Sequence, residues 1–418
     1  MVAAKLMAKQ KPGRRSIACG RELMMEVPDH SVGRRVYYVS GFDPRGAPFY
    51  HRFFSQQLTR FTERTGRVFS MGPRRKDGRG LLSRWQVKEE GDVGAVVCNL
   101  DYCFLHWDDI VRGAWVRDPI RLLRSGLLMY NYYLLQGALW RIRRISYPAA
   151  ICILVPFGVA LVAMLLAILA GFVVGSLAAT TGLVAPLPWL LALTIGLGVL
   201  VVAWQLAEQL KIVWMFRSMQ FTRLIGQSGD GALRGRLKLH ALAILELEQR
   251  EPAAEILIVG HSIGSLVMAM LAAELRRQPG FAVIGPKLSL LTLGQILPFL
   301  AEQASAKTFH RDLVELSLEP RLPWLDVSST DDFLCFPGVD PYASCGLDIP
   351  EPAYLVMELI PLAQRQALTS LWEVIKHQLG LHFEYIATAD PERSGGFDYL
   401  ELVLKPAAGS VLNEHPFS

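Results

Sequence analysis

The sequence lacks charge where a soluble enzyme would carry it. Only 19% of its 418 residues are Asp, Glu, Lys or Arg, against about 25% in a typical soluble domain. Residues 145–207 contain no Asp, Glu, Lys, Arg or His, a run of 63 positions. The rest of the chain is long enough for one large domain or two small ones. The composition excludes a disordered chain, a collagen-like fibre and an ordinary soluble enzyme.

The sequence also lacks the cysteine patterns that hold metals or disulfide frameworks. The chain has six cysteines, which are Cys19, Cys98, Cys103, Cys152, Cys335 and Cys345. They include no C-x-x-C pair, and the histidines show no spacing typical of a metal site. We therefore expect reduced cysteines in a cytoplasmic chain, and neither a metal nor a cofactor. The net charge of +5 is too small to indicate a nucleic-acid partner. The basic N-terminal tail, residues 1–33, has no apolar stretch after its first basic residues, so we expect no secretory signal.

Two long apolar stretches lie inside the uncharged run, at about residues 148–175 and 186–205. About 20 apolar residues in a helix cross a hydrocarbon core of roughly 30 Å. Gly182 and the prolines at 186 and 188 favour a turn between the stretches. We predict a transmembrane helical hairpin over residues 147–207. The alternative is a hydrophobic hairpin buried inside a large soluble core.

The flanks of the hairpin predict its orientation. Basic residues lie before and after it, namely Arg141, Arg143, Arg144, Lys211, Arg217 and Arg223, and the connecting loop is uncharged. Because Lys and Arg remain preferentially on the cytoplasmic side, we expect both flanks in the cytoplasm, at the inner membrane. Trp189, Trp204 and Trp214 lie near the expected membrane interfaces.

The segment before the hairpin, residues 110–146, carries seven arginines and one acidic residue, with aromatic residues between them. This pattern is typical of a helical segment in the headgroup layer, with arginines toward anionic lipid. It equally fits a solvated helix that only leads into the membrane span.

The rest of the chain alternates between strand and helix patterns. Strands are expected at residues 34–42, 83–89, 93–102, 255–260, 287–294, 323–329 and 397–404. Helices are expected at residues 47–66, 231–250, 262–277 and 362–379. Apolar strands that alternate with helices predict an α/β fold with a mainly parallel sheet, in two parts over residues 34–109 and 208–405. Residues 406–418 form a C-terminal tail.

One motif carries chemistry. Residues 260–264 read Gly-His-Ser-Ile-Gly, a G-x-S-x-G pattern between an apolar strand and a helix of small residues. Glycines suit a sharp strand-to-helix turn, which would expose the oxygen of Ser262 at a helix N-terminus. The alternative is a serine that only caps a helix in a tight turn. No G-x-G-x-x-G or G-x-x-x-x-G-K-[ST] motif accompanies it.

With its G-H-S-x-G elbow after an apolar strand, the sequence resembles the α/β-hydrolase superfamily, especially its lipases and esterases. The membrane hairpin looks like an insertion before the elbow strand. The resemblance implies Ser262 as nucleophile and the backbone N–H groups of Ile263 and Phe42 as an oxyanion hole, where Phe42 follows the early strand. The alternative for residues 41–44 is a simple turn.

The family's order of Ser, acid and His implies the other two residues. Asp332, with Asp331 as the alternative, lies in the loop after the strand at 323–329, whereas Asp326 lies inside that strand. His382, just after the helix stop at Gly380, is the expected base, with His377 as the alternative. A helix before His382 departs from the family pattern, and a buried structural histidine is the other reading.

These expectations amount to a membrane-anchored serine hydrolase that cleaves an ester or thioester of a lipid or other acyl group. The alternative is an inactive α/β-hydrolase-like scaffold or sensor in the membrane. The expected partners are the lipid bilayer and a small acyl ester or lipid. The oligomeric state stays open.

Overall fold

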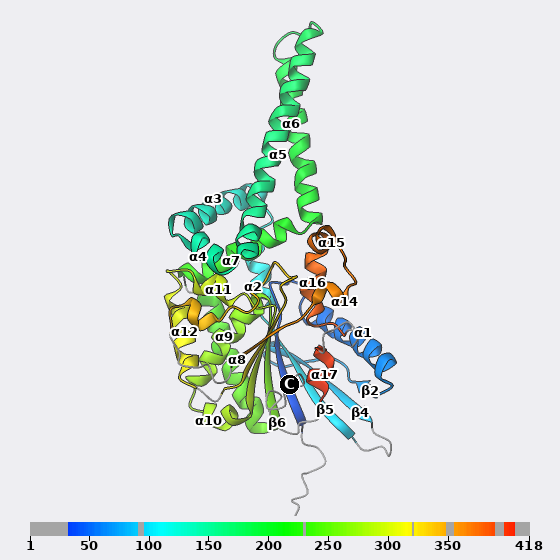
Figure 1. Cartoon of the computed structure of the whole chain (residues 1–418), viewed down its shortest axis with the longest axis vertical. Coiled ribbons are helices and arrows are strands. Elements are labelled where there is room, and N and C mark those ends of the chain that lie inside the picture. The colour runs from blue at the N-terminus through cyan, green and yellow to red at the C-terminus, as the bar shows by residue number, and fades with distance from the viewer. Residues whose placement is uncertain are drawn as a thin grey trace, which may run out of the picture.

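The computed structural model describes residues 32–90, 96–228, 231–319, 322–347, 355–388 and 397–405. A layered α/β domain carries a long helical hairpin that projects from one end (Figure 1). Residues 1–31 of the expected basic tail and the whole of the expected C-terminal tail at 406–418 lie outside the described residues.

The domain is built on one nine-stranded sheet in the order β2-β4-β5-β1-β6-β7-β8-β9, with β3 paired to β4. In this order the strands from β5 to β9 run parallel, whereas β4 pairs antiparallel with β5, β2 and β3. Their bounds are β1 Val32–Val39, β2 Val68–Met71, β3 Arg75–Lys76, β4 Leu82–Glu90, β5 Val96–Leu105, β6 Ala253–His261, β7 Leu288–Leu293, β8 Trp324–Ser328 and β9 Leu355–Leu359. The predicted α/β class with a mainly parallel sheet is confirmed.

Both faces of the sheet are covered by helices. Successive residues of β6 illustrate this, because Ile256 and Ile258 pack into one buried cluster while Leu257 and Val259 pack into another. The first cluster includes residues of α8, α9 and α12, and the second includes residues of α1, α16 and α17. Strands buried on both faces read as continuous apolar runs, which is why β6 and β7 could be recognised in the sequence.

The helices of the domain fall between the strands. In the first half they are α1 Ala47–Thr65, α2 Asp108–Ala114, α3 Pro119–Leu135 and α4 Ala138–Ile145. After the hairpin come α7 Ile212–Ser228, α8 Gly231–Arg250, α9 Ile263–Arg276, α10 Phe281–Ile284, the 3₁₀ helix η1 Gly285–Lys287, α11 Leu297–Ala301, α12 Lys307–Ser317 and α13 Pro341–Ser344. The last are α14 Leu362–Arg365, α15 Leu371–Lys376, α16 Gln378–Glu384 and α17 Tyr399–Leu404.

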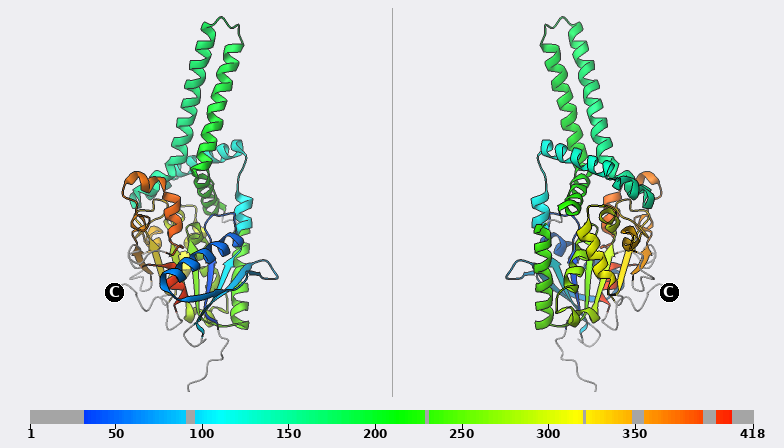
Figure 2. Two further views of the ribbon diagram at one scale, coloured as in Figure 1. Left: turned by 90° about the vertical axis from the view of Figure 1, so that its right-hand side faces the viewer. Right: turned by 90° about the vertical axis from the view of Figure 1, so that its left-hand side faces the viewer.

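The hairpin consists of α5 Tyr147–Thr180 and α6 Leu187–Gln209, which run side by side away from the domain (Figure 2). Both helices are long and apolar enough to cross a membrane. Most of their leucines, valines and isoleucines are exposed, which contradicts the alternative of a hairpin buried in a soluble core. The two helices meet through small residues, since an added Cβ at Gly171 would lie 2.7 Å from the carbonyl oxygen of Ala192.

Helix α5 is held by the domain at its first turns. Ala149, Ala150, Ile153 and Pro156 are buried there. The hydroxyl of Tyr130 donates to the carbonyl oxygen of Ile153 (2.9 Å) and accepts from the N–H of Phe157 (3.2 Å). In a regular helix the Phe157 N–H would donate directly to the Ile153 carbonyl oxygen. Here, next to Pro156, the Tyr130 hydroxyl lies between them. This bridge divides α5 into a base within the domain and an apolar part beyond it.

Two predicted elements differ in the structure. The single helix expected at 362–379 is three short helices, α14, α15 and α16, and Gly380 lies inside α16 rather than ending a helix. The strand expected at 397–404 is helix α17, because the Asp398 carboxylate accepts from the N–H groups of Leu400 and Glu401 and caps a helix start. A short, fully buried apolar run has no period that separates strand from helix. Strands β2, β3 and β9 were not predicted from the sequence.

Some residues assigned to the membrane surface belong to the domain. Arg217 is buried, where it pairs with Glu208 and donates to the carbonyl oxygen of Val116 (2.8 Å). Trp214 is half-buried and donates to the carbonyl oxygen of Phe42 (2.9 Å). The tyrosines of the arginine-rich segment, Tyr130, Tyr132 and Tyr133, are buried in the core rather than set in a headgroup layer.

Candidate functional site

Ser262 lies at a strained turn between strand β6 and helix α9. Its backbone has φ 57° and ψ −126°, a left-handed φ that non-glycine residues rarely adopt. Neighbouring glycines allow the turn, because an added Cβ at Gly260 would lie 2.6 Å from the carbonyl oxygen of Gly264. At Gly264 it would lie 2.6 Å from the carbonyl oxygen of Ser40. The G-x-S-x-G pattern therefore has the steric basis that the sequence indicated.

The loop after β1 approaches Ser262 from the neighbouring strand. Val39, at the end of β1, pairs with Gly260 near the end of β6. An added Cβ at Gly41 would lie 3.2 Å from the Ser262 Cβ and 3.6 Å from its Oγ. Within the described part of the chain, the N–H groups of Phe42 and Ile263 donate no hydrogen bond to a protein group. Neither N–H is therefore committed to another protein group of the described residues.

Asp332 and His382 form a buried pair. The His382 Nδ1 lies 2.7 Å from the Asp332 Oδ2, and both side chains are almost fully buried. Asp332 lies in the loop after β8, and His382 lies on α16 rather than in the loop that the sequence suggested. The Tyr385 hydroxyl also donates to the Asp332 Oδ2 (3.2 Å).

The environment of Asp332 favours its ionised form. Burial alone would raise the pKa of Asp332, but the charge of His382 and hydrogen bonds from His382, the Leu334 N–H and the Cys335 thiol hold that pKa below its ordinary value. An ionised carboxylate can only accept, so Nδ1–H donates to it. The His382 Nε2 is buried and has no hydrogen-bond partner. This nitrogen is therefore not committed to another protein group.

His261, inside the motif, fixes the backbone of His382. Its Nε2–H donates to the His382 carbonyl oxygen (2.7 Å), and the two rings lie 5.1 Å apart. Burial, followed by the charge of His382, lowers the pKa of His261 to about 3, so its ring is neutral. Sequence reasoning missed this contact, although the residue lies in the motif, because no local pattern reveals a partner 121 positions away.

The alternative acid and base lie elsewhere. Asp331 accepts from the N–H of Ala363 (2.9 Å) and has no bond to either histidine. His377 is exposed between α15 and α16. Asp326 lies inside β8, as expected, where it accepts from Thr292 and Ser328 at 2.7 Å each. Of the candidate acids and bases, Asp332 and His382 are the two that the fold brings together.

Two cavities meet at Ser262 and His382, which line both. The smaller, of about 60 Å³, is mainly apolar and is lined by residues of α5, α7, α9 and the loop after β8. The larger, of about 520 Å³, contains Gly41, Phe42 and several aromatic side chains together with Arg45, Glu208 and Lys211. The carboxyl ends of the parallel strands, where these residues lie, face the hairpin (Figure 1).

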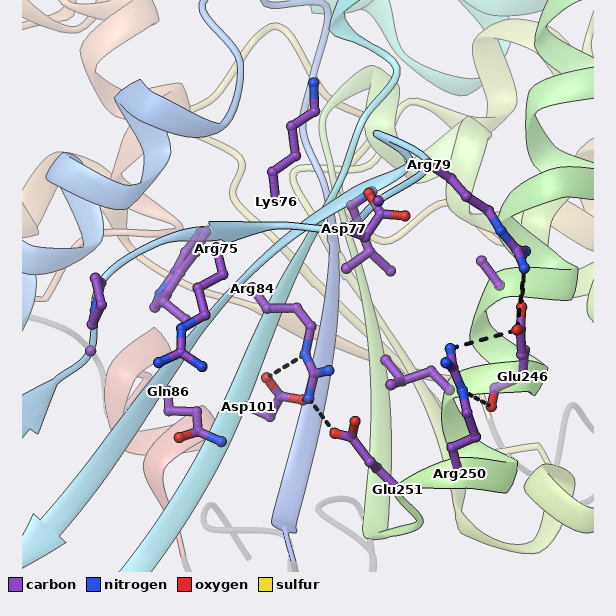
Figure 3. Close-up of a pocket in the computed structure, with 17 residues that line it drawn as sticks. Arg75, Lys76, Asp77, Arg79, Arg84, Gln86, Asp101, Glu246, Arg250 and Glu251 are labelled. Atoms are coloured by element: carbon purple, nitrogen blue, oxygen red, sulfur yellow. Dashed lines mark hydrogen bonds and ion pairs between the residues drawn. The ribbon is translucent and has the colours of Figure 1, made fainter.

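A further cavity, of about 510 Å³, lies between the β3–β4 turn and helix α8 and shares no lining residue with the two above (Figure 3). Its charges are largely paired with one another. Arg84 bonds to Asp101 and Glu251, and Arg79 and Arg250 both reach Glu246. Because no Ser, Thr or Cys lines it and most of its acids and bases are paired, we do not regard it as the reactive site.

Among the described residues, no group of three or more His, Cys, Asp or Glu is placed to hold a metal ion. Cys98, Cys103, Cys152, Cys335 and Cys345 are free thiols. No family model, no curated protein and no solved structure matches this chain. The geometry of the chain's own residues is therefore the basis for any functional conclusion.

Proposed function

We propose that this protein is a membrane-anchored serine hydrolase of the α/β-hydrolase type that cleaves an ester or thioester. The observation that carries the proposal is the Asp332–His382 pair (2.7 Å), because His382 lines the same two cavities as Ser262 and its Nε2 has no hydrogen-bond partner. The strained backbone of Ser262 and the two unused N–H groups beside it add to this support. Strand order alone would not distinguish an enzyme from an inactive relative.

The proposed mechanism is acyl transfer in two steps. The Ser262 Oγ attacks the carbonyl carbon while the His382 Nε2 takes its proton, and Asp332 holds the ring and stabilises the imidazolium. The N–H groups of Phe42 and Ile263 bind the oxyanion. The tetrahedral intermediate then releases an alcohol or thiol, which receives the proton from His382. Water, activated by His382 in turn, releases the acid and restores Ser262.

The membrane setting extends the proposal. The hairpin anchors the protein in the inner membrane, and the basic residues beside its two ends, Arg143, Arg144 and Lys211, favour a cytoplasmic position for the catalytic domain. A lipid or other acyl ester is the substrate class that this location favours, and the bilayer itself is the expected partner.

The test is labelling by a fluorophosphonate, which reacts with activated serines. Membranes containing the wild-type chain, Ser262→Ala, His382→Ala and Asp332→Asn are compared. We expect no labelling of Ser262→Ala and a loss of at least about 100-fold in rate for His382→Ala, the scale of general-base catalysis. His377→Ala and Asp331→Asn are matched controls and should stay within about twofold of wild type.

Two outcomes would contradict the proposal. If a folded wild-type chain is not labelled, the protein is an inactive scaffold or sensor of the same fold. If Ser262→Ala is labelled as fast as wild type, another residue is the nucleophile.

A further inference from the structure

The hairpin does more than anchor the domain, because its first turns form a wall of the candidate site. Ala149, Cys152 and Ile153 of α5 line the small apolar cavity that Ser262 and His382 also line. Met215 and Met219 of α7, the helix that follows the hairpin, line the same cavity. One continuous helix therefore runs from the cavity beside Ser262 to the far tip of the hairpin.

The length of α5 places this wall at the membrane surface. At 1.5 Å per residue, residues 157–180, beyond the Tyr130 bridge, extend about 36 Å, slightly more than a hydrocarbon core of roughly 30 Å. Cys152 lies five residues before Phe157, or about 8 Å along the helix. The cavity thus reaches the layer in which lipid headgroups and ester carbonyls lie.

Helix α3 supports the same position of the domain. It lies across the base of the hairpin (Figure 2) and exposes Ile120, Leu123 and Leu127 on one side, with Ile120 79% exposed. The opposite side of α3, including Leu122, Met129 and Tyr133, is buried in the domain. An exposed apolar stripe beside a membrane span is the pattern of a helix that lies in the membrane interface.

The larger cavity is lined by one basic side chain that forms no ion pair with a described residue. Lys211, between α6 and α7, lines it and has no acidic partner among the described residues. In contrast, Arg45 is paired with Asp43 (2.6 Å), and Glu208 is paired with Arg217 (2.8 Å). Because Lys211 follows the end of a predicted span by two residues, its ammonium lies at headgroup depth and favours an anionic group there.

Building on the hydrolase activity proposed above, we propose that the substrate is a phosphate-bearing lipid ester that stays in the leaflet next to the domain during cleavage. Its acyl chain enters the cavity between α5 and α7, and its phosphate lies toward Lys211. The 60 Å³ cavity is too small to enclose a long chain, so the chain continues along α5 into the bilayer. Attack by Ser262 breaks the acyl C–O bond, and the lysolipid alcohol leaves with the proton from His382.

The experiment uses the full chain reconstituted in phosphatidylcholine vesicles. Release of fatty acid is measured for long-chain phosphatidylglycerol and for diacylglycerol in those vesicles, beside hydrolysis of soluble p-nitrophenyl acetate. Cys152→Trp fills the cavity, and we expect it to lower the ratio of long-chain to acetate kcat/KM at least about tenfold. Leu154→Trp, on the exposed side of the same helix, is the matched control and should leave the ratio unchanged.

A second pair of variants tests the charge. Lys211→Gln should lower phosphatidylglycerol turnover about tenfold relative to diacylglycerol turnover, whereas Lys238→Gln, exposed on α8, should not. Equal loss on all substrates, or no change in either ratio, would overturn the inference. So would a labelled wild-type enzyme that cleaves the acetate but not phosphatidylglycerol. An unlabelled wild type would instead defeat the proposed hydrolase activity itself.

Discussion

The glycines around Ser262 differ in what an added side chain would meet. Gly260 and Gly264 let the strand turn into the helix, where any side chain would meet backbone atoms. Gly41 has a different neighbour, because an added Cβ there would meet the side chain of Ser262 and the His261 carbonyl oxygen. A side chain at Gly260 or Gly264 would strain the backbone and so lower the stability of the fold. A side chain at Gly41 would instead occupy the space beside Ser262 in which a reacting carbonyl would lie.

Gly41→Ala therefore should separate activity from stability. We expect it to lower the rate of fluorophosphonate labelling about tenfold or more, because its methyl group lies 3.6 Å from the Ser262 Oγ. Its melting temperature in detergent should change by only a few degrees. Gly264→Ala should instead lower the melting temperature strongly, since backbone carbonyl oxygens cannot move away. Full labelling of Gly41→Ala would show that the loop after β1 does not border the reacting centre.

Asp326 predicts a pH dependence of stability. Burial raises its pKa to about 7, whereas hydrogen bonds from Thr292 and Ser328 offset only part of this rise. An unfolded Asp ionises near pH 3.9, so between about pH 4 and pH 7 the folded state holds a proton that the unfolded state has lost. This contribution is complete below about pH 4 and is lost as pH rises toward 7.

Asp326→Asn should remove that loss. The difference in free energy of unfolding between the variant and the wild type should shift in favour of the variant by up to about 4 kcal/mol from pH 4 to pH 8, at 1.36 kcal/mol per pKa unit. Ser328 can accept from the new amide, so the side chain keeps its partners. Thermal unfolding in detergent from pH 4 to pH 8 measures this difference. Parallel pH profiles for the two proteins would mean that Asp326 is ionised in the fold.

At the scale of elements, α5 and α6 pack closely because glycine and alanine fill their interface. An added Cβ at Gly171 would lie 2.7 Å from the Ala192 carbonyl oxygen, and one at Gly175 would lie 2.9 Å from the Ala192 Cβ. On the other faces of both helices the large apolar side chains are exposed. Small residues let helices approach within a bilayer, where the hydrophobic effect does not drive them together.

Gly171→Leu should open this interface, while Gly158→Leu should not. Gly158 lies on the same helix with nothing within 4 Å of an added Cβ, which makes it a matched control. We expect Gly171→Leu to lower the melting temperature of the vesicle-bound protein. We also expect it to increase the distance between the two helices, as measured by cross-linking. Equal behaviour of the two variants would show that α5 and α6 do not pack through this stripe in the membrane.

At the scale of the molecule, the sheet presents the carboxyl ends of its parallel strands toward the hairpin (Figure 1). Ser262 follows β6 at this edge, and Asp332 lies in the loop after β8. The loops at the carboxyl ends of strands are the usual position of sites in such sheets. Both outer ends of the hairpin lie on the side of the domain, so the proposed membrane span would hold the candidate site against the bilayer.

The proposed topology can be measured directly. Gly182→Cys, in the loop between α5 and α6, should react with a membrane-impermeant maleimide from outside intact cells. Gly78→Cys, in the β3–β4 turn, has open space around it and should react only after the cells are lysed. Reaction of Gly78→Cys in intact cells would place the domain outside and reverse the proposed orientation.

The features that can be predicted from the sequence are those whose physical cause lies in neighbouring residues. The hairpin follows from 63 uncharged positions, the elbow from two glycines around Ser262, and the buried strands from unbroken apolar runs. Each of these patterns lies within one segment, so its physical cause is visible in neighbouring residues. The sequence also singled out Asp332 and His382 as candidates, and their roles as acid and base stay a prediction.

Which residues meet depends on the folded arrangement of distant segments. The tertiary structure placed His382 on a helix, joined Asp332 to His382 across 50 positions, and set His261 against a carbonyl 121 positions away. It made the last apolar run a helix, α17, and made the base of α5 a wall of the candidate site. These outcomes depend on packing between segments that are distant in the chain, and a local pattern carries no information about the partner that a side chain will find.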